Sequence, residues 1–430
     1  MWSNASKSWV NSRSLIRLVA ACALLLVVFS LSTTGARAQS AIDRQVSAIP
    51  ASVLLTHSPA QLVDPNRQAA AQYFTKYTRP AWFVRIGLQV LIFLYLWGSG
   101  HAARLRDRLR RTLPNITLVR FVYGGFIALA LQIAAFPTQF YDYRILRIMD
   151  ISTQSSASFF SDLLLSLALQ IVFIGVAVVL ILWLVDRTRL WWVYVMLGVF
   201  ATSFFISSVY PVVIQPLFNH FSVLPADRLL TKRLHGLALK AGEGELPIYV
   251  TDLSRRTKAG DAYVEGLGPS KRLVIGDTFI NTATDDEIVF IAAHELGHDV
   301  HHDVLRGTLI GALIFILGAA FAVLIADRIG FRRDDDPLSR LTLVAALLVC
   351  MYAVFLPAIN GFSRVIESEA DRYALQLEPD RAAGTRVMVR FADQGLELLC
   401  PGRLARIFWY NHPPIGTRIA NINGTPNPCP

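Results

Sequence analysis

The stretch 162–185, DLLLSLALQIVFIGVAVVLILWLV, decides the class of fold. After its first residue it carries no charged side chain, and about 20 such residues suffice for a helix to cross a bilayer. The whole chain of 430 residues is 53% hydrophobic and only 17% charged, whereas soluble globular domains carry about 25% charged residues. The sequence therefore predicts a mainly α-helical, polytopic membrane protein and excludes a wholly water-exposed fold.

Other apolar runs divide the chain into membrane and polar parts. The predicted spans are 81–98, 118–137, 162–185, 190–214, 304–326 and 341–359. The predicted organisation is a signal peptide or first membrane helix at 1–38, an exported polar segment at 39–80, four spans within 81–217, a small α+β domain at 218–303, two spans within 304–359 and a polar part at 360–430 that completes this domain.

The N-terminus is typical of an export signal. Three basic residues, Lys7, Arg13 and Arg17, precede the apolar run 18–31, and small residues follow at 36–38. This is the order of a secretory signal, although the run remains as a membrane helix if it is not cleaved.

The formal net charge of +10 at pH 7 does not indicate a nucleic-acid partner. Much of the basic excess lies in short loops between apolar runs, with five arginines in 104–111 and three more at 328–333. Loops of this kind follow the positive-inside rule of membrane proteins. We therefore expect a lipid bilayer as partner and no nucleic acid.

In the polar block 218–303, apolar and polar residues alternate as in a soluble α+β domain. Its pattern predicts a helix at 225–241, a strand at 247–251, a hairpin of 262–267 and 272–275, and a helix from Thr284 to about 300. Thr284 and Glu287 form a capping-box pair at the start of the last helix.

That last helix carries His294-Glu295-Leu296-Gly297-His298, an HExxH sequence. Residues at i and i+4 share one helical face, so both imidazoles can reach a single metal ion. Zinc lowers the pKa of a bound water towards ~7, and Glu295 is placed to take up its proton. The spacing therefore predicts one zinc ion per chain in a hydrolytic site.

Catalytic zinc takes three protein ligands and keeps one position open. The segment 360–371, NGFSRVIESEAD, begins where the last apolar run ends. Glu367 and Asp371 share one helical face; we assign Glu367 as third ligand and Asp371 as the acceptor that orients a ligand histidine. Glu369 is the competing ligand, but it points away from that face.

Together these motifs resemble the integral-membrane zinc peptidases of the CAAX prenyl protease 1 family. That family joins an HExxH helix to a later N-x-x-S-R-x-x-E-x-x-A-D segment, and both are intact here. Smaller matches are QPLFN at 215–219, GDT at 276–278 and HPP at 412–414, so the similarity covers about 70–430.

The resemblance implies a role for each matching residue. It makes Glu295 the general base and His412 the group that stabilises the tetrahedral oxyanion, while Arg364 and Arg418 brace the site. It also implies the zinc ligands His294, His298 and Glu367.

One segment departs from the family pattern. The family has Asn-Ala-Tyr, with the Asn aiding substrate alignment, where this chain has Asp261, Ala262 and Tyr263. An ionised carboxylate cannot donate the amide hydrogen bond. We expect this change to affect substrate register or rate and not zinc binding, and the adjoining hairpin to hold an extended peptide as an added strand.

Two further features bear on chemistry. His301 and His302 follow the motif, and we expect a solvated helix end there, with a second metal site as the alternative. The four cysteines contain no CxxC pair, which excludes a thiolate zinc site. Cys400 and Cys429 lie in polar surroundings and allow one disulfide.

Loop charge predicts the side of the membrane on which the site lies. With 18–31 as the first crossing, fourteen Lys and Arg lie in the N-terminus and short loops opposite the site, against six in the shorter segments on its own side. The basic side is cytoplasmic, and a disulfide persists only in an oxidising compartment. We expect a bacterial-type inner membrane protein whose catalytic domain faces the periplasm or exterior.

The sequence thus predicts a membrane-embedded zinc endopeptidase that acts on envelope or membrane proteins. One alternative is a CAAX-type processing protease with the cytosolic active site that the resemblance implies. The others are a divalent-metal transporter that uses the histidine cluster with Asp299, and an inactive scaffold that keeps the fold.

Overall fold

The structure, a computed structural model, describes residues 46–330 and 336–429. The expected signal at 1–38 lies outside these residues. Six described helices are long and apolar enough to cross a membrane, and each corresponds to one predicted span. They are α4 (Pro65–Gly98), α6 (Ile116–Ile148), α7 (Ser156–Arg187), α8 (Trp191–Val209, continued by π and 3-10 turns to Leu217), α12 (Asp303–Gly330) and α13 (Pro337–Leu377).

Two of these helices continue far beyond their apolar runs. α4 begins at Pro65, where the Asp64 side chain accepts hydrogen bonds from the backbone N–H groups of Asn66 and Arg67. Residues 65–80 of the expected polar segment are therefore the first half of a membrane helix. α13 likewise runs for 41 residues and carries 360–371 out of the spanning bundle. In both helices the side chains change from apolar to polar where the apolar run ends. The backbone nevertheless remains helical across that point.

The polar part contains a four-stranded sheet, whose strands lie in the order β1-β2-β4-β3. Its strands are β1 (Phe221–Val223), β2 (Ile248–Thr251), β3 (Ala262–Glu265) and β4 (Arg272–Gly276). β2 and β4 are parallel, and the predicted hairpin is confirmed by the antiparallel pairing of β3 with β4. β3 therefore lies at the edge of the sheet.

Helices pack over this sheet around one core. Buried apolar residues of the sheet and of α9, α11, α14 and α16 form a single cluster, and the segment 46–63 packs into it. The predicted capping box is present at the start of α11. The helices are α2 (Ala51–Thr56), α3 (Pro59–Leu62), α9 (Leu229–Lys240), α10 (Asp277–Thr282), α11 (Asp285–Val300), α14 (Arg381–Gly395), α15 (Arg403–Trp409) and α16 (Ile415–Asn423), with 3-10 turns at Val46–Ala48, Leu253–Arg255 and Gly268–Ser270.

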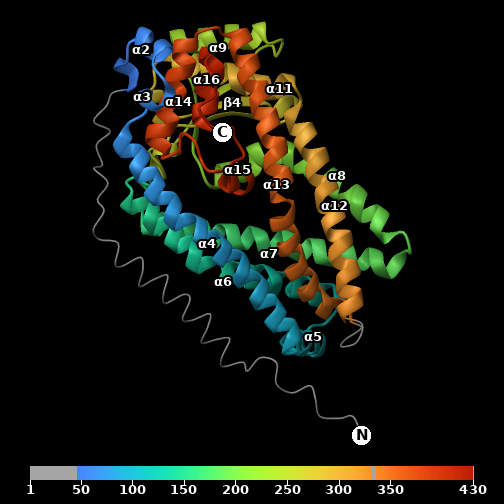
Figure 1. The fold of residues 1–430 in the computed structure, drawn as a ribbon. Helices are drawn as coiled ribbons and strands as arrows, with labels where there is room; N and C mark the ends of the chain where they lie inside the picture. Colours follow the sequence, from blue (N-terminus) through green and yellow to red (C-terminus); the bar gives the residue numbers. More distant parts are fainter. Residues whose placement is uncertain (1–45, 331–335, 430) are drawn as a thin grey trace.

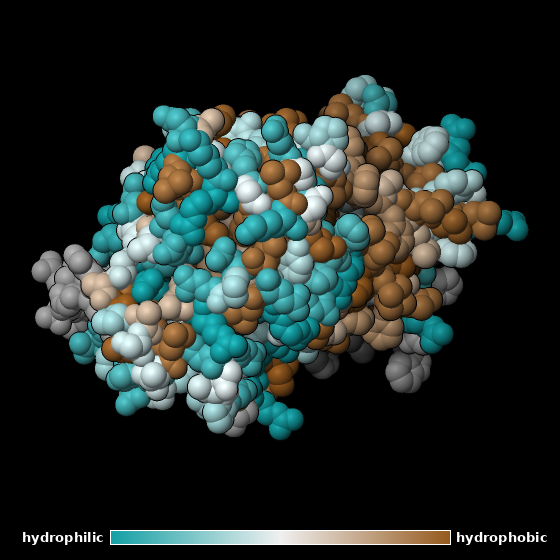
Figure 2. Space-filling model, turned by 90° about the horizontal axis from the view of Figure 1, so that it is seen from above, coloured by the Kyte–Doolittle hydropathy of each residue, from teal (hydrophilic) through white to brown (hydrophobic). Residues whose placement is uncertain are grey.

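The polar part sits at one end of the spanning helices, and α5 (His101–Thr112) lies at the other (Figure 1). Seen from the polar end, the surface is largely hydrophilic, while hydrophobic residues gather on the side where α8 and α12 lie (Figure 2). Large apolar side chains such as Phe205 (64% exposed) and Leu324 (63%) point outward there. Such a belt needs a lipid environment.

Candidate metal centre

Two helices bring the three predicted ligands together. α11 presents His294 and His298 on one face, and α13 presents Glu367 from beyond the bilayer border. The two His Nε2 atoms are 3.2 Å apart, and Glu367 Oε2 lies 3.3 Å from the Nε2 of His294. In the described part of the chain these three residues form the one group able to hold a metal ion, with ligand atoms all within 4.8 Å of one another.

The arrangement fits a tetrahedral cation. A tetrahedron with metal–ligand bonds of about 2.0–2.1 Å has edges of about 3.3–3.4 Å. The two Nε2 atoms lie 3.2 Å apart, and the Glu367 carboxylate approaches both rings, with Oε2 at 3.3 Å from His294 and Oε1 at 3.6 Å from His298. Glu367 Oε2 is buried and accepts no hydrogen bond from any described residue. A buried carboxylate oxygen without a donor is costly unless a cation compensates it.

His294 is held from behind by a buried ion pair. Its Nδ1 lies 3.0 Å from Asp371 Oδ1, and Arg418 donates two hydrogen bonds to the same carboxylate, at 2.9 and 2.6 Å. All three side chains are almost fully buried. The contacts from Arg418 through Asp371 to His294 fix the imidazole ring with its Nε2 towards the metal position. Asp371 and Arg418 thus lie in line behind the Nδ1 of His294.

His298 has an equivalent partner that the sequence analysis missed. Its Nδ1 lies 3.0 Å from Asp303 Oδ2, and Arg306 joins Asp303 to Glu369 at 2.7 and 2.6 Å. The competing ligand Glu369 therefore pairs with Arg306 and points away from the metal position. A signal was available, because Asp303 is the first acidic residue after the turn that ends α11.

Glu295 lies between the ligand histidines on α11. Burial raises the pKa of Glu295 to about 8, and the neighbouring His294 opposes that rise. A carboxyl group with a pKa near neutrality is suited to accepting and returning a proton.

His412 also lies at the metal position, next to Glu367. Its Nε2 lies 3.2 Å from Glu367 Oε1, and 45% of its side chain is exposed. Burial among surrounding groups lowers the pKa of His412, so the neutral ring is favoured. The loop that carries it is held by Arg364, which donates to the carbonyl oxygens of Arg406 and Tyr410 at 2.8 and 2.6 Å. A recess of about 290 Å³ adjoins His412 and is lined also by Arg79 and Glu397, neither of which the sequence suggested.

The segment 261–263 lies at the start of the edge strand. The backbone oxygen of Asp261 accepts a hydrogen bond from Gly276, and Ala262 is buried. Surrounding protein raises the pKa of Asp261 to about 6, although its side chain is accessible to solvent. It therefore changes charge within the physiological range.

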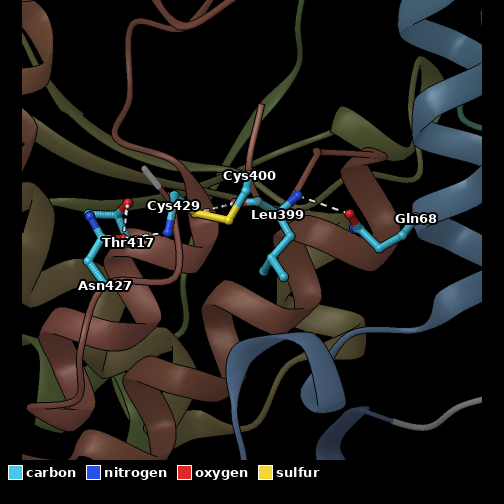
Figure 3. Close-up of a disulfide and its surroundings, with 6 residues drawn as sticks. All are labelled: Gln68, Leu399, Cys400, Thr417, Asn427 and Cys429. Atoms are coloured by element: carbon cyan, nitrogen blue, oxygen red, sulfur yellow. Dashed lines mark hydrogen bonds between the residues drawn. A yellow bond between two sulfur atoms is a disulfide. The ribbon is translucent and has the colours of Figure 1, made fainter. Parts of the chain in front are cut away.

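The remaining candidates lie away from the metal position. His301 caps the end of α11, with its Nδ1 2.7 Å from the oxygen of Gly297, and His302 has a φ of +55° in the turn that follows. Cys400 and Cys429 are joined by a disulfide (Figure 3). It ties the C-terminal segment to Cys400, whose neighbour Leu399 donates its N–H to the side-chain oxygen of Gln68 in α4.

Comparisons with known proteins agree with this geometry. A family model described as peptidase family M48 matches residues 226–425, and one described as CAAX prenyl protease N-terminal, five membrane helices, matches 55–220. The metalloprotease YhfN of Bacillus subtilis is 30% identical over 393 residues, which cover 89% of this chain and 91% of that protein. An Arabidopsis thaliana CAAX prenyl protease 1 homolog is 28% identical, over 54% of this chain and 56% of its own length.

The fold has a solved counterpart in the crystal structure of S. mikatae Ste24p. The TM-score is 0.72 at 21% identity, and the match covers 93% of this chain and 98% of that one. The sequence match along most of the chain and the common fold lead to one assignment: this chain belongs to the M48 family of membrane metalloproteases, of the CAAX prenyl protease 1 type.

Proposed function

We propose that the chain is a zinc-dependent endopeptidase of the cell envelope. The observation that carries this proposal is the ligand set His294, His298 and Glu367 at tetrahedral spacing, with Glu295 beside it. These ligands would hold zinc, whose chemistry there is to polarise the scissile carbonyl and to acidify water.

The protein's own residues then divide the work of hydrolysis. Glu295 takes the proton of the attacking water and passes it to the leaving amine. His412, next to Glu367, donates a hydrogen bond to the oxygen that becomes negative. The free edge of β3 holds the substrate as an extended strand, which places the scissile bond along the face of α11.

The distribution of charge supports an outward-facing site. Exposed or partly exposed arginines lie at the end of the bundle remote from the metal centre, as Arg110 on α5 and Arg340 at the start of α13 illustrate (Figure 1). The disulfide lies in the peptidase part, and disulfides persist in oxidising compartments. An outward site excludes cytosolic prenylated tails as substrates and favours membrane or envelope proteins.

Hydrolysis is tested with Glu295→Gln, which keeps size and hydrogen bonding but removes the base. We expect bound zinc at one ion per chain and a loss of peptide hydrolysis of at least ~10³-fold. Glu378→Gln, at the end of α13, is the matched control and should behave as wild type. Wild-type cleavage by the Glu295 variant, or metal-free wild-type protein, would refute the proposal.

Orientation is tested with reporters fused after Pro430 in a bacterial host. Alkaline phosphatase forms its disulfides only outside the cytoplasm, so we expect it to be active and a cytoplasmic reporter at the same point to be inactive. The reverse pattern would assign the site to the cytosol and favour CAAX-type processing.

A further inference from the structure

Helix α5, HAARLRDRLRRT, carries five arginines at the end of the bundle remote from the metal centre. It follows α4 after a turn at Gly100, whose φ of +74° suits glycine. Its inner face is firmly docked: Leu105 and Leu109 pack against a buried cluster of α4, α6, α7 and α13. Arg110 also pairs at 2.8 Å with Asp336, the N-cap of α13.

The outer face is a row of arginines. Arg104, Arg108 and Arg111 follow one another at helical spacings of four and three, and all three are exposed. No carboxylate in the described ranges lies within ion-pair distance of them. Like charges one turn apart destabilise a helix, so the row is unfavourable unless an anion compensates it.

Neighbouring residues place this row at the level of the lipid headgroups. Arg120 near the start of α6 pairs with Asp186 at the end of α7, which ties that end of the bundle together. Just beyond, at the start of α8, Trp192 and Tyr194 are each about half exposed. Exposed aromatic rings at the ends of spans mark the boundary between bilayer and water.

We propose that Arg104, Arg108 and Arg111 bind the headgroups of anionic phospholipids. A guanidinium group donates paired hydrogen bonds to phosphate oxygens and keeps its charge at any physiological pH. Three of them in a row on a docked helix form a fixed surface that a zwitterionic lipid, with its own ammonium group, satisfies less well. The proposal is independent of the protease assignment.

The test compares phosphatidylglycerol with phosphatidylcholine of identical acyl chains, counted on the purified full chain by native mass spectrometry. The variant Arg104→Gln/Arg108→Gln/Arg111→Gln should lose preference for phosphatidylglycerol by on the order of tenfold to a hundredfold. The matched control Arg228→Gln/Lys232→Gln/Lys240→Gln removes three exposed charges around α9 and should keep the wild-type preference.

An unchanged preference in the α5 variant, or an equal loss in the control, would overturn the proposal. If the glutamine variant does not fold, the wild type is measured at increasing ionic strength. Its preference for phosphatidylglycerol should then fall, and a preference that does not depend on salt would refute the proposal. Soluble glycerol phosphate should not displace the bound lipid, and displacement would refute a lipid site.

Discussion

The metal centre has two walls that are held in different ways. On the wall formed by α11, α13 and α16, His294, Asp371 and Arg418 are 3–5% exposed and form one line of ion pairs. On the other wall, His412 leaves 45% of its side chain exposed, and Asp261 is exposed at the start of an edge strand. The comparison teaches that the groups we propose to position the metal ligands are buried, while those we propose to meet the substrate stay accessible.

The strongest way to break this comparison is to remove a ligand from the buried wall. Glu367→Gln should reduce bound zinc to near zero and hydrolysis to background, because two imidazoles alone cannot complete the site. Metal content and peptide cleavage are measured on the same sample. Glu369→Gln, the competing candidate on the same helix, should retain the metal, and the opposite pattern would exchange their roles.

The open wall should affect the reaction without affecting the metal. His412→Ala is expected to lower kcat by on the order of 10²–10³-fold, the usual cost of losing one oxyanion donor, with zinc content unchanged. Steady-state kinetics and metal analysis check this together. Loss of zinc in this variant would contradict this role and indicate that His412 takes part in metal binding.

A smaller effect is expected from the groups that orient the ligands. Asp371→Asn keeps the shape but weakens the acceptor for His294, and loss of such a partner costs about 10–100-fold in metal affinity. Competition with a chelator measures that affinity. Asp303→Asn should cost less, because the His298 side chain is 20% exposed against 4% for His294. Equal losses of metal affinity in the two variants would show that burial does not determine how much each partner contributes.

The smallest effect is a pH-dependent one at Asp261. Its pKa is raised to about 6, so wild type has a neutral, donating group below that pH and a repelling carboxylate above it. Asp261→Asn should therefore match wild type in kcat/KM near pH 5 and exceed it by about tenfold near pH 8, the worth of one hydrogen bond. A ratio that does not change with pH would exclude this role.

The residues that come together at the metal position could be named from the sequence because their signals are local. An i, i+4 pair on one helix, as in His294 and His298, can be read without knowing the fold. Arg364 is different: the resemblance implied a bracing role, but its partners are carbonyl oxygens in the loop before His412. Backbone acceptors leave no trace in residue identity.

In the fold, too, local features could be predicted and features that depend on tertiary contacts could not. Hydropathy locates all six described spans, yet it places the start of α4 near residue 81 and not at Pro65. The parallel pairing of β2 with β4 joins strands separated by β3 in the chain. That pairing depends on tertiary packing, which periodicity along one segment cannot reveal.

The length of α13 has a consequence for biosynthesis. Its 41 residues connect the far end of the bundle to Glu367, so a ribosome completes the HExxH helix before the third ligand exists. Two further membrane helices must be inserted, and α13 must dock against α11, before the ligand set is complete. A newly made chain is therefore inactive during synthesis, and assembly of the bundle itself acts as its maturation step.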